Sequence, residues 1–326
     1  MKIQKLAIAA IVCATVFFTS CEKSDTNPTK VNFSNAPAAS LAPSASVEVV
    51  TEDKVRYHVL NFGTRWTSTI VESEKEITLV DVGINNSGGA VIPVDLSNSG
   101  AELRAYANAI KKPMNIIITH PHIDHYINLD KFKDVTVYAQ TKDAAVLNTD
   151  ATFNQVYGDT AIGVSGSKEI GGFEYYFDNV SGTEAVENGY VYIPTERAVF
   201  TGDLTAIKRH SYIRDYTPLD SVDELSIWIN ALTDMKSKFS NYKYIFVGHL
   251  GYQTNVTGNF DATIAYIGNA QGLIKGTKNL TAGGTATSVQ QVVDELKILY
   301  PTYGDGALYF SLPNAFYPGD PGAHWF

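Results

Sequence analysis

Short apolar segments alternate with polar, turn-forming residues along most of this chain. Three of them, at residues 55–63, 67–73 and 76–83, have the composition and the flanking turns of β-strands. A helical pattern follows at residues 100–111, where apolar side chains recur three and four positions apart. The apolar segment 115–119 then predicts a strand that ends on His120.

Strands and helices remain mixed in the second half of the chain. The same patterns predict strands at 136–140, 173–180, 189–194, 198–204 and 242–249, and helices at 141–148, 221–239, 259–276 and 288–300. No repeat of 20 to 50 residues is visible. A layered α/β fold is the simplest architecture for this order of elements.

The N-terminal residues have the pattern of an export signal. Two lysines precede a short apolar stretch, and small residues lead into Cys21, so residues 1–20 are predicted to be a signal peptide rather than a membrane span. The segment VFFTSC resembles a bacterial lipobox, which implies lipidation of Cys21 and anchoring in the cell envelope. A plain signal peptide with an incidental cysteine is the alternative. Residues 22–52, rich in Ser, Ala, Asn and Pro, are predicted to be a flexible linker, and residues 53–326 a single folded domain.

Composition and charge narrow the possible partners. The chain has 326 residues, 44% of them hydrophobic, which suits a globular protein with a sizeable core. Its formal charge is −9, and loss of residues 1–20 would make it −11, which argues against nucleic acid as a partner. The only cysteines are Cys13 and Cys21, so the mature domain would contain neither a disulfide nor a cysteine metal ligand.

The stretch IIITHPHIDHYINL carries three of the seven histidines of the chain within six residues. A strand that runs into a loop allows His120 and His122 to point to one side, because side chains alternate along an extended segment. Asp124 and His125 follow and can reach a neighbouring point. Imidazole and carboxylate groups are metal ligands, so the spacing predicts two adjacent cation sites.

This H-x-H-x-D-H motif resembles the signature of the metallo-β-lactamase superfamily at all four fixed positions. The resemblance implies a four-layer αββα sandwich in which further loops supply the remaining ligands. Asp203 in AVFTGDL matches the family's Gly-Asp position, which bridges both metals, and His249 in YIFVGHLG matches its late Gly-His position. Asp81 in EITLVDVG matches an acid that supports the ligands or their loop.

One ligand position departs from the family pattern. Where its members usually carry a histidine in a G-H-T stretch, this chain has SGTEAVEN, and the matching residue is Glu184. The segment resembles the G-T-E-A segment of the secreted alkyl sulfatases of the superfamily, in which the glutamate binds metal. Either a carboxylate takes this position, or Glu184 is an exposed acid and the ligand is Glu187 or is missing. Asn188 also matches a position that class B β-lactamases fill with asparagine.

The resemblance implies a binuclear hydrolase. His120, His122 and Glu184 would hold one divalent ion, and Asp124, His125 and His249 the other, with Asp203 shared. Zinc is the default ion for nitrogen and carboxylate ligands, with manganese or iron as alternatives. A bridging hydroxide would attack an ester, a lactone, a β-lactam or a sulfate ester of a small molecule, and Asp124 would orient it.

A basic and aromatic stretch after Asp203 is the candidate substrate loop. It contains Lys208, Arg209, His210, Tyr212 and Arg214, and Tyr212 is the candidate oxyanion donor. A solvated loop whose aromatic rings cover the core is the alternative. His58 and His324 suggest only packing or surface roles.

Two other functions remain open. The chain could be a non-catalytic surface binding module that keeps the fold with a vestigial metal, or a redox protein with a di-iron pair. Retention of both sets of ligands favours the hydrolase over the binding module, and no flavodoxin-like partner domain supports the redox function. The sequence leaves the oligomeric state undetermined.

Overall fold

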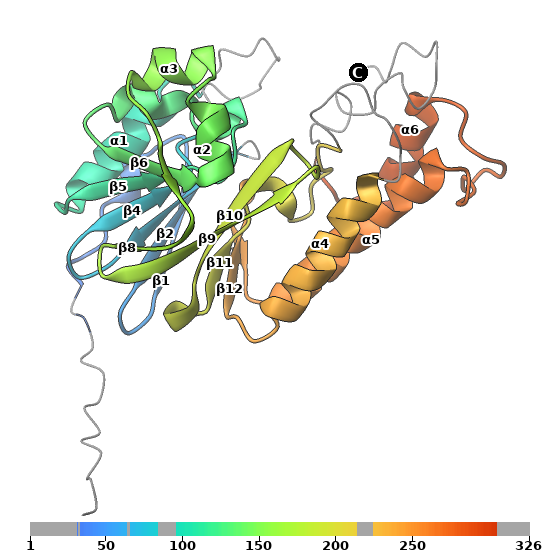
Figure 1. Cartoon of the computed structure of the whole chain (residues 1–326). Coiled ribbons are helices and arrows are strands. Elements are labelled where there is room, and N and C mark those ends of the chain that lie inside the picture. Colours follow the sequence, from blue (N-terminus) through green and yellow to red (C-terminus); the bar gives the residue numbers. More distant parts are fainter. Residues whose placement is uncertain (1–30, 32, 64–65, 84–95, 214–223, 305–326) are drawn as a thin grey trace, which may run out of the picture.

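Two β-sheets pack face to face, and helices cover both outer faces (Figure 1). The structure is a computed structural model that describes residues 31, 33–63, 66–83, 96–213 and 224–304. Sheet A contains the N-terminal strands and sheet B the C-terminal ones. The chain passes from one sheet to the other once, at Ser165, between the last strand of sheet A and the first of sheet B.

Sheet A has its seven strands in sequence order. They are β1 (Ser46–Thr51), β2 (Arg56–Phe62), β3 (Trp66–Glu72), β4 (Ile77–Val80), β5 (Met114–Ile117), β6 (Thr136–Gln140) and β7 (Ile162–Val164). Strands β1 to β4 are antiparallel, and β4 to β7 are parallel. The parallel arrangement brings the carboxyl ends of β4 and β5 to the same edge of the sheet.

Sheet B has six strands in the order β13, β12, β11, β10, β9, β8. They are β8 (Gly166–Ile170), β9 (Phe173–Ser181), β10 (Glu187–Ile193), β11 (Ala198–Phe200), β12 (Tyr244–Phe246) and β13 (Tyr252–Gln253). Only β11 and β12 are parallel neighbours, and their carboxyl ends therefore meet at one edge.

Helices lie on the outer side of each sheet (Figure 1). Those beside sheet A are α1 (Ser99–Ala109), α2 (Thr141–Leu147) and α3 (Ala151–Tyr157). Those beside sheet B are α4 (Glu224–Lys238) and α5 (Val256–Ile274), and α6 (Val289–Leu299) packs against α5. Short 3-10 helices complete the connections, at η1 (Ala39–Leu41), η3 (Ile123–His125), η4 (Ile127–Lys131), η5 (Pro194–Glu196) and η6 (Gly202–Leu204). Within the described residues, no helix combines the length and apolar composition needed to cross a bilayer.

Three clusters of buried hydrophobic residues fill the spaces between these layers. One joins sheet A to its helices through residues such as Leu103 and Phe132, and a second lies between the sheets around Tyr57 and Phe200. The third joins sheet B to its helices, with Trp228 at its centre. Each sheet therefore buries both faces, as the mixture of apolar strands and amphipathic helices requires. The predicted αββα sandwich is confirmed.

The predicted linker is too long at its C-terminal end. Residues 46–51 were assigned to it, but they form β1, which pairs with β2 along its whole length. Its residues are exposed or half-buried because β1 is an edge strand, so it lacks the apolar alternation that marks the inner strands. The signal peptide and Cys21 lie outside the described residues.

Candidate metal centre

Four connections bring the predicted ligands to one edge of the sandwich. The loop after β5 carries His120, His122, Asp124 and His125, and the β9–β10 turn carries Glu184. The other two connections follow the parallel strands β11 and β12 and carry Asp203 and His249. Sheet A thus supplies four of the seven side chains and sheet B three.

His120, His122 and Glu184 form the first group of donors, here called site 1. His120 Nε2 lies 3.1 Å from His122 Nδ1. Glu184 Oε1 lies 3.0 Å from His122 Nδ1, and its Oε2 lies 3.6 Å from His120 Nε2. Glu184 is only 1% exposed. The alternative hypothesis, that Glu184 is a solvent-exposed acid, is therefore wrong.

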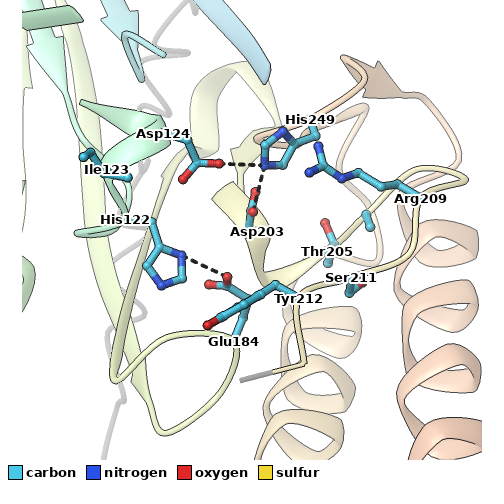
Figure 2. Close-up of a pocket in the computed structure, with 11 residues that line it drawn as sticks. His122, Ile123, Asp124, Glu184, Asp203, Thr205, Arg209, Ser211, Tyr212 and His249 are labelled. Carbon is cyan, nitrogen blue, oxygen red and sulfur yellow. Dashed lines mark hydrogen bonds and ion pairs between the residues drawn. The ribbon is translucent and has the colours of Figure 1, made fainter. Parts of the chain in front are cut away.

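Asp124, His125 and His249 form the second group, site 2. An Asp124 carboxylate oxygen lies 3.9 Å from His125 Nε2. The other lies 3.6 Å from His249 Nε2, the pair joined by a dashed line in Figure 2. Asp203 lies between the two sites, since it also forms a group with His120 and His125. Its Oδ1 is 3.5 Å from His125 Nε2 and its Oδ2 is 2.9 Å from His249 Nε2.

These spacings fit a metal ion better than they fit a network of ion pairs. Zinc bonds of 2.0–2.1 Å in a tetrahedron place neighbouring donors about 3.3 Å apart, close to the separations in both sites. His125 Nε2 and Asp203 Oδ1 are buried and make no hydrogen bond, although both face the space between the sites. A buried polar atom without a partner is costly, and a bound cation would satisfy both atoms.

The protonation states of His120 and Asp203 suit metal binding. Burial, with the neighbouring His125 and His122 rings, holds the pKa of His120 well below its usual value, which keeps the imidazole neutral. Burial opposes ionisation of Asp203, but His249 and His125 outweigh it and hold the pKa of Asp203 well below its usual value. A neutral imidazole and an ionised carboxylate are the forms that coordinate divalent ions.

Asp81 supports the ligand His125 and the loop that carries it, as the sequence analysis predicted for this acid. It follows β4 with φ 59°, a left-handed conformation that strains a residue other than glycine. Its carboxylate accepts hydrogen bonds from Thr119 N and His125 Nδ1, both at 2.9 Å. The bond to Nδ1 leaves Nε2 of His125 facing the centre, the arrangement that fixes a metal-binding tautomer.

Gly248 is a site residue that the sequence analysis missed. A Cβ atom there would lie 2.3 Å from Asp203 Oδ1 and 2.6 Å from His125 Cε1, so only glycine allows the β12 loop to approach. The Gly-His pair in the sequence is the signal that could have identified it.

Comparison with known proteins supports what the geometry indicates. A model of the metallo-beta-lactamase superfamily matches residues 67–153, a segment that contains the whole loop after β5. This segment is similar to the metallo-beta-lactamase superfamily. Comparison with curated protein sequences gives no match.

Solved structures of the superfamily share the fold at low sequence identity. TMB-1 is 19% identical, with a TM-score of 0.51 over 70% of this chain and 99% of its own. A metallo-beta-lactamase from Pontibacter korlensis is 18% identical, with a TM-score of 0.49 over 69% of this chain and all of its own. IND-7 is also 18% identical, with a TM-score of 0.49 over 69% of this chain and 98% of its own. The fold and the three groups of donors together make this edge of the sandwich a candidate site for divalent metal ions.

A cavity of about 230 Å³ opens beside the donors. Its walls come from both sites and from the segment after η6, and Figure 2 shows them around the opening. The lining residues are His122, Ile123, Asp124, Glu184, Asp203, Thr205, Ala206, Arg209, Ser211, Tyr212 and His249. The volume suits a small substrate.

The predicted substrate loop forms one wall of this cavity. Tyr212 places its ring perpendicular to that of His122, with 5.6 Å between centroids. Arg209 lies beside His249 (Figure 2), and its charge lowers the pKa of His249 after the larger effect of burial. The alternative of a wholly solvated loop therefore does not describe Arg209 or Tyr212.

Backbone pairing explains why Arg209 faces the cavity. Gly304 N donates to Lys208 O at 2.8 Å, and His210 N donates to Gly304 O at 3.2 Å. His210 is buried on the opposite side, with Nδ1 3.1 Å from Tyr266 Oη. Side chains alternate along an extended segment, so burial of His210 directs Arg209 toward the metal ligands.

The other candidates lie elsewhere or outside the described residues. His58 is fully buried between Tyr106 and Glu72, a packing role as expected. Lys208 lines a separate surface groove. Arg214 and His324 are not among the described residues.

Proposed function

We propose that this chain is a binuclear metal-dependent hydrolase of a small ester, lactone, β-lactam or sulfate ester. The observation that carries the proposal is the convergence of seven donors from both sheets at 2.9–3.9 Å spacings around buried atoms that make no hydrogen bond. Two divalent ions held by these donors would supply Lewis acidity, which lowers the pKa of water and polarises the group under attack.

The side chains of the cavity have separate roles in this proposal. Asp124 is the most accessible carboxylate of the donors, with a side chain 27% exposed, and it orients the attacking water and accepts its proton. Tyr212 donates a hydrogen bond to the oxygen that gains negative charge. Arg209 binds an anionic group of the substrate on the side of site 2. We therefore favour a substrate that carries a carboxylate or sulfate next to the bond that is cleaved.

Elemental analysis of purified protein, followed by a panel of substrates, tests this function. We expect about two equivalents of zinc, manganese or iron, and turnover of at least one member of a panel of lactam, lactone, phosphate ester and sulfate ester substrates. The variant E184Q should lose about one equivalent. Zero or one equivalent without turnover would instead favour the non-catalytic binding module, and two equivalents in E184Q would show that Glu184 is not a ligand.

We further propose that the chain is exported and anchored through a lipid on Cys21, as the N-terminal sequence indicates. Mass spectrometry of the N-terminal peptide from membrane fractions tests this, with C21S as the control. A diacylated or triacylated peptide is expected. An unmodified Cys21 within a longer N-terminus would contradict the anchor.

A further inference from the structure

Asp143 is a fully buried acid that takes no part in the reaction proposed above. It lies in the first turn of α2, directly after β6. Its carboxylate accepts a hydrogen bond from Gly189 N at 3.1 Å and another from Asn179 Nδ2 at 3.0 Å. No ion pair between described residues includes it. Burial of a carboxyl group is costly, and these two hydrogen bonds offset that cost only while Gly189 and Asn179 keep their positions.

The carboxylate lies where the two segments that carry site 1 come together. Gly189 is in β10, just after the turn that carries Glu184, and Thr119 immediately precedes His120. A Cβ atom on Gly189 would lie 2.4 Å from Thr119 O and 2.6 Å from Asp143 Oδ2. Gly189, Thr119 and Asp143 are therefore packed with no room for a methyl group between them.

Asn188 extends this contact to Glu184. It is fully buried, and in the amide orientation that satisfies both ends its Oδ1 accepts from Ala185 N at 2.6 Å. Its Nδ2 then donates to Glu184 Oε2 at 3.3 Å. Gly189 follows Asn188 directly in the chain. Asp143 therefore binds the backbone of Gly189, and the neighbouring Asn188 binds Glu184.

We propose that Asp143 is a positioning residue for Glu184, which fixes the β9–β10 turn against the loop after β5 and so controls occupation of site 1. The inference rests on the proposed function, because it requires a metal ion between Glu184, His120 and His122. Among the described residues, the hydrogen bonds of Asp143 go to Asn179 and Gly189 and not to a ligand of site 2, which should be unaffected.

The test compares D143A and D143N with E295A in the full-length chain. Glu295 is a matched control, since it is 3% exposed on α6 and its carboxylate accepts from Thr281 N at 2.9 Å and from Thr281 Oγ1, far from the centre. Zinc equivalents are counted by native mass spectrometry, and the affinity of each equivalent is measured by competition with a chelator. Thermal unfolding of each variant without metal measures the loss of stability alone.

We expect D143A to weaken one of the two equivalents by about ten- to a hundredfold and to leave the other unchanged, as supporting residues around metal ligands do. E295A should lower the melting temperature without changing either affinity. D143N keeps an oxygen for Gly189 N but opposes Asn179 Nδ2 with a second donor, so it should recover part of the loss.

Two further variants assign the weakened equivalent to a site. In H249A, which lacks a ligand of site 2, adding D143A should weaken the remaining affinity by the same factor of about ten to a hundred. In H122A, which lacks a ligand of site 1, adding D143A should change the remaining affinity by less than about twofold.

The possible results separate this inference from the proposed function. Wild-type protein that binds no metal would defeat both. Two equivalents in the wild type, with either equal weakening of both or wild-type affinity for both in D143A, would overturn only the role of Asp143. If D143A does not fold, D143N decides alone, because an unchanged affinity at both sites in that variant also overturns the proposal.

Discussion

Glu184 gives the two sites a matched set of donors. Each has two imidazoles and one carboxylate, and Asp203 is shared between them. Oxygen donors favour manganese and iron relative to zinc, whereas imidazole favours zinc. If Glu184 binds the ion as proposed, the preference of site 1 for zinc should be lower than that of a site of three histidines.

The variant E184H should restore that preference. We expect the ratio of zinc to manganese affinity at one equivalent to rise by about tenfold. The measurement is competition between the two ions, followed by elemental analysis. E187H is the control, because Glu187 is the first residue of β10, three positions after Glu184, and its carboxylate accepts a hydrogen bond from Ser181 Oγ. An equal rise in both variants would contradict the assignment of Glu184 to site 1.

Removal of the Tyr212 hydroxyl tests the oxyanion role. In Y212F, kcat should fall by about a hundredfold while KM changes little, since a group that acts only on the developing charge does not bind the ground state. Steady-state kinetics on any substrate found in the panel provides the measurement. An unchanged kcat would leave the ring as a wall of the cavity only.

At the scale of elements, the N-terminal edge of sheet A depends on residues that the sequence assigned to a linker. Phe33 lies over two cations, with its ring centroid 4.6 Å from Arg56 Cζ and 5.3 Å from Lys112 Nζ. Lys112 Nζ also donates to Glu72 Oε1 at 2.8 Å. Glu72 is fully buried and also pairs with His58 at 2.9 Å. This segment therefore covers a buried charge network.

The variant F33A should destabilise the fold by about 1–2 kcal/mol, the range for cation–π contacts that are partly shielded from water. Urea unfolding measures the change. F33L is the control, because leucine keeps much of the apolar cover but has no aromatic face. Equal stability of F33A and the wild type would mean that the segment only rests on the surface.

Local patterns predicted some elements well and others poorly, for identifiable reasons. The strands 56–62 and 66–72 and helix α1 have strong apolar periodicity, and their predicted positions agree with the structure to within a residue or two. Strands β1, β7 and β8 were missed because most of their residues are exposed and lack an inner apolar face. Helix α3 was missed because its sequence, ATFNQVY, consists mostly of residues with weak helix propensity.

The candidate site divides in the same way. The loop after β5 is local in sequence, so its four side chains could be named from spacing alone. Glu184, Asp203 and His249 came from resemblance, since nothing in their own segments requires a ligand. The role of Asp143 could not be predicted from the sequence, because it depends on hydrogen bonds with Gly189 and Asn179, which are 46 and 36 residues away.

At the scale of the whole molecule, the buried carboxyl group of Asp143 should make the free energy of unfolding depend on pH. Burial raises the pKa of Asp143 to about 7, against the opposing effect of its Asn179 and Gly189 donors. The folded state thus holds a proton that the unfolded chain releases near the ordinary pKa of 3.8 for this side chain. This stabilising contribution is complete at low pH and is lost as pH rises toward about 7.

The comparison with D143N isolates that contribution. Between about pH 4 and pH 7 the wild type should lose on the order of 4 kcal/mol of unfolding free energy relative to D143N. Urea titrations of both metal-free proteins across this range provide the data, and the ligands titrate alike in both. Parallel pH profiles would mean that Asp143 is ionised throughout.

The single passage of the chain between the sheets has a consequence for assembly. A cut at Ser165 would yield one fragment with all of sheet A and another with all of sheet B. The first fragment would carry four of the donors, and the second would carry three. The first four are His120, His122, Asp124 and His125, and the other three are Glu184, Asp203 and His249. Bound ions would therefore link the two fragments. Complementation of the fragments should therefore be far stronger with zinc than with a chelator, and sedimentation of the mixed fragments would measure the difference.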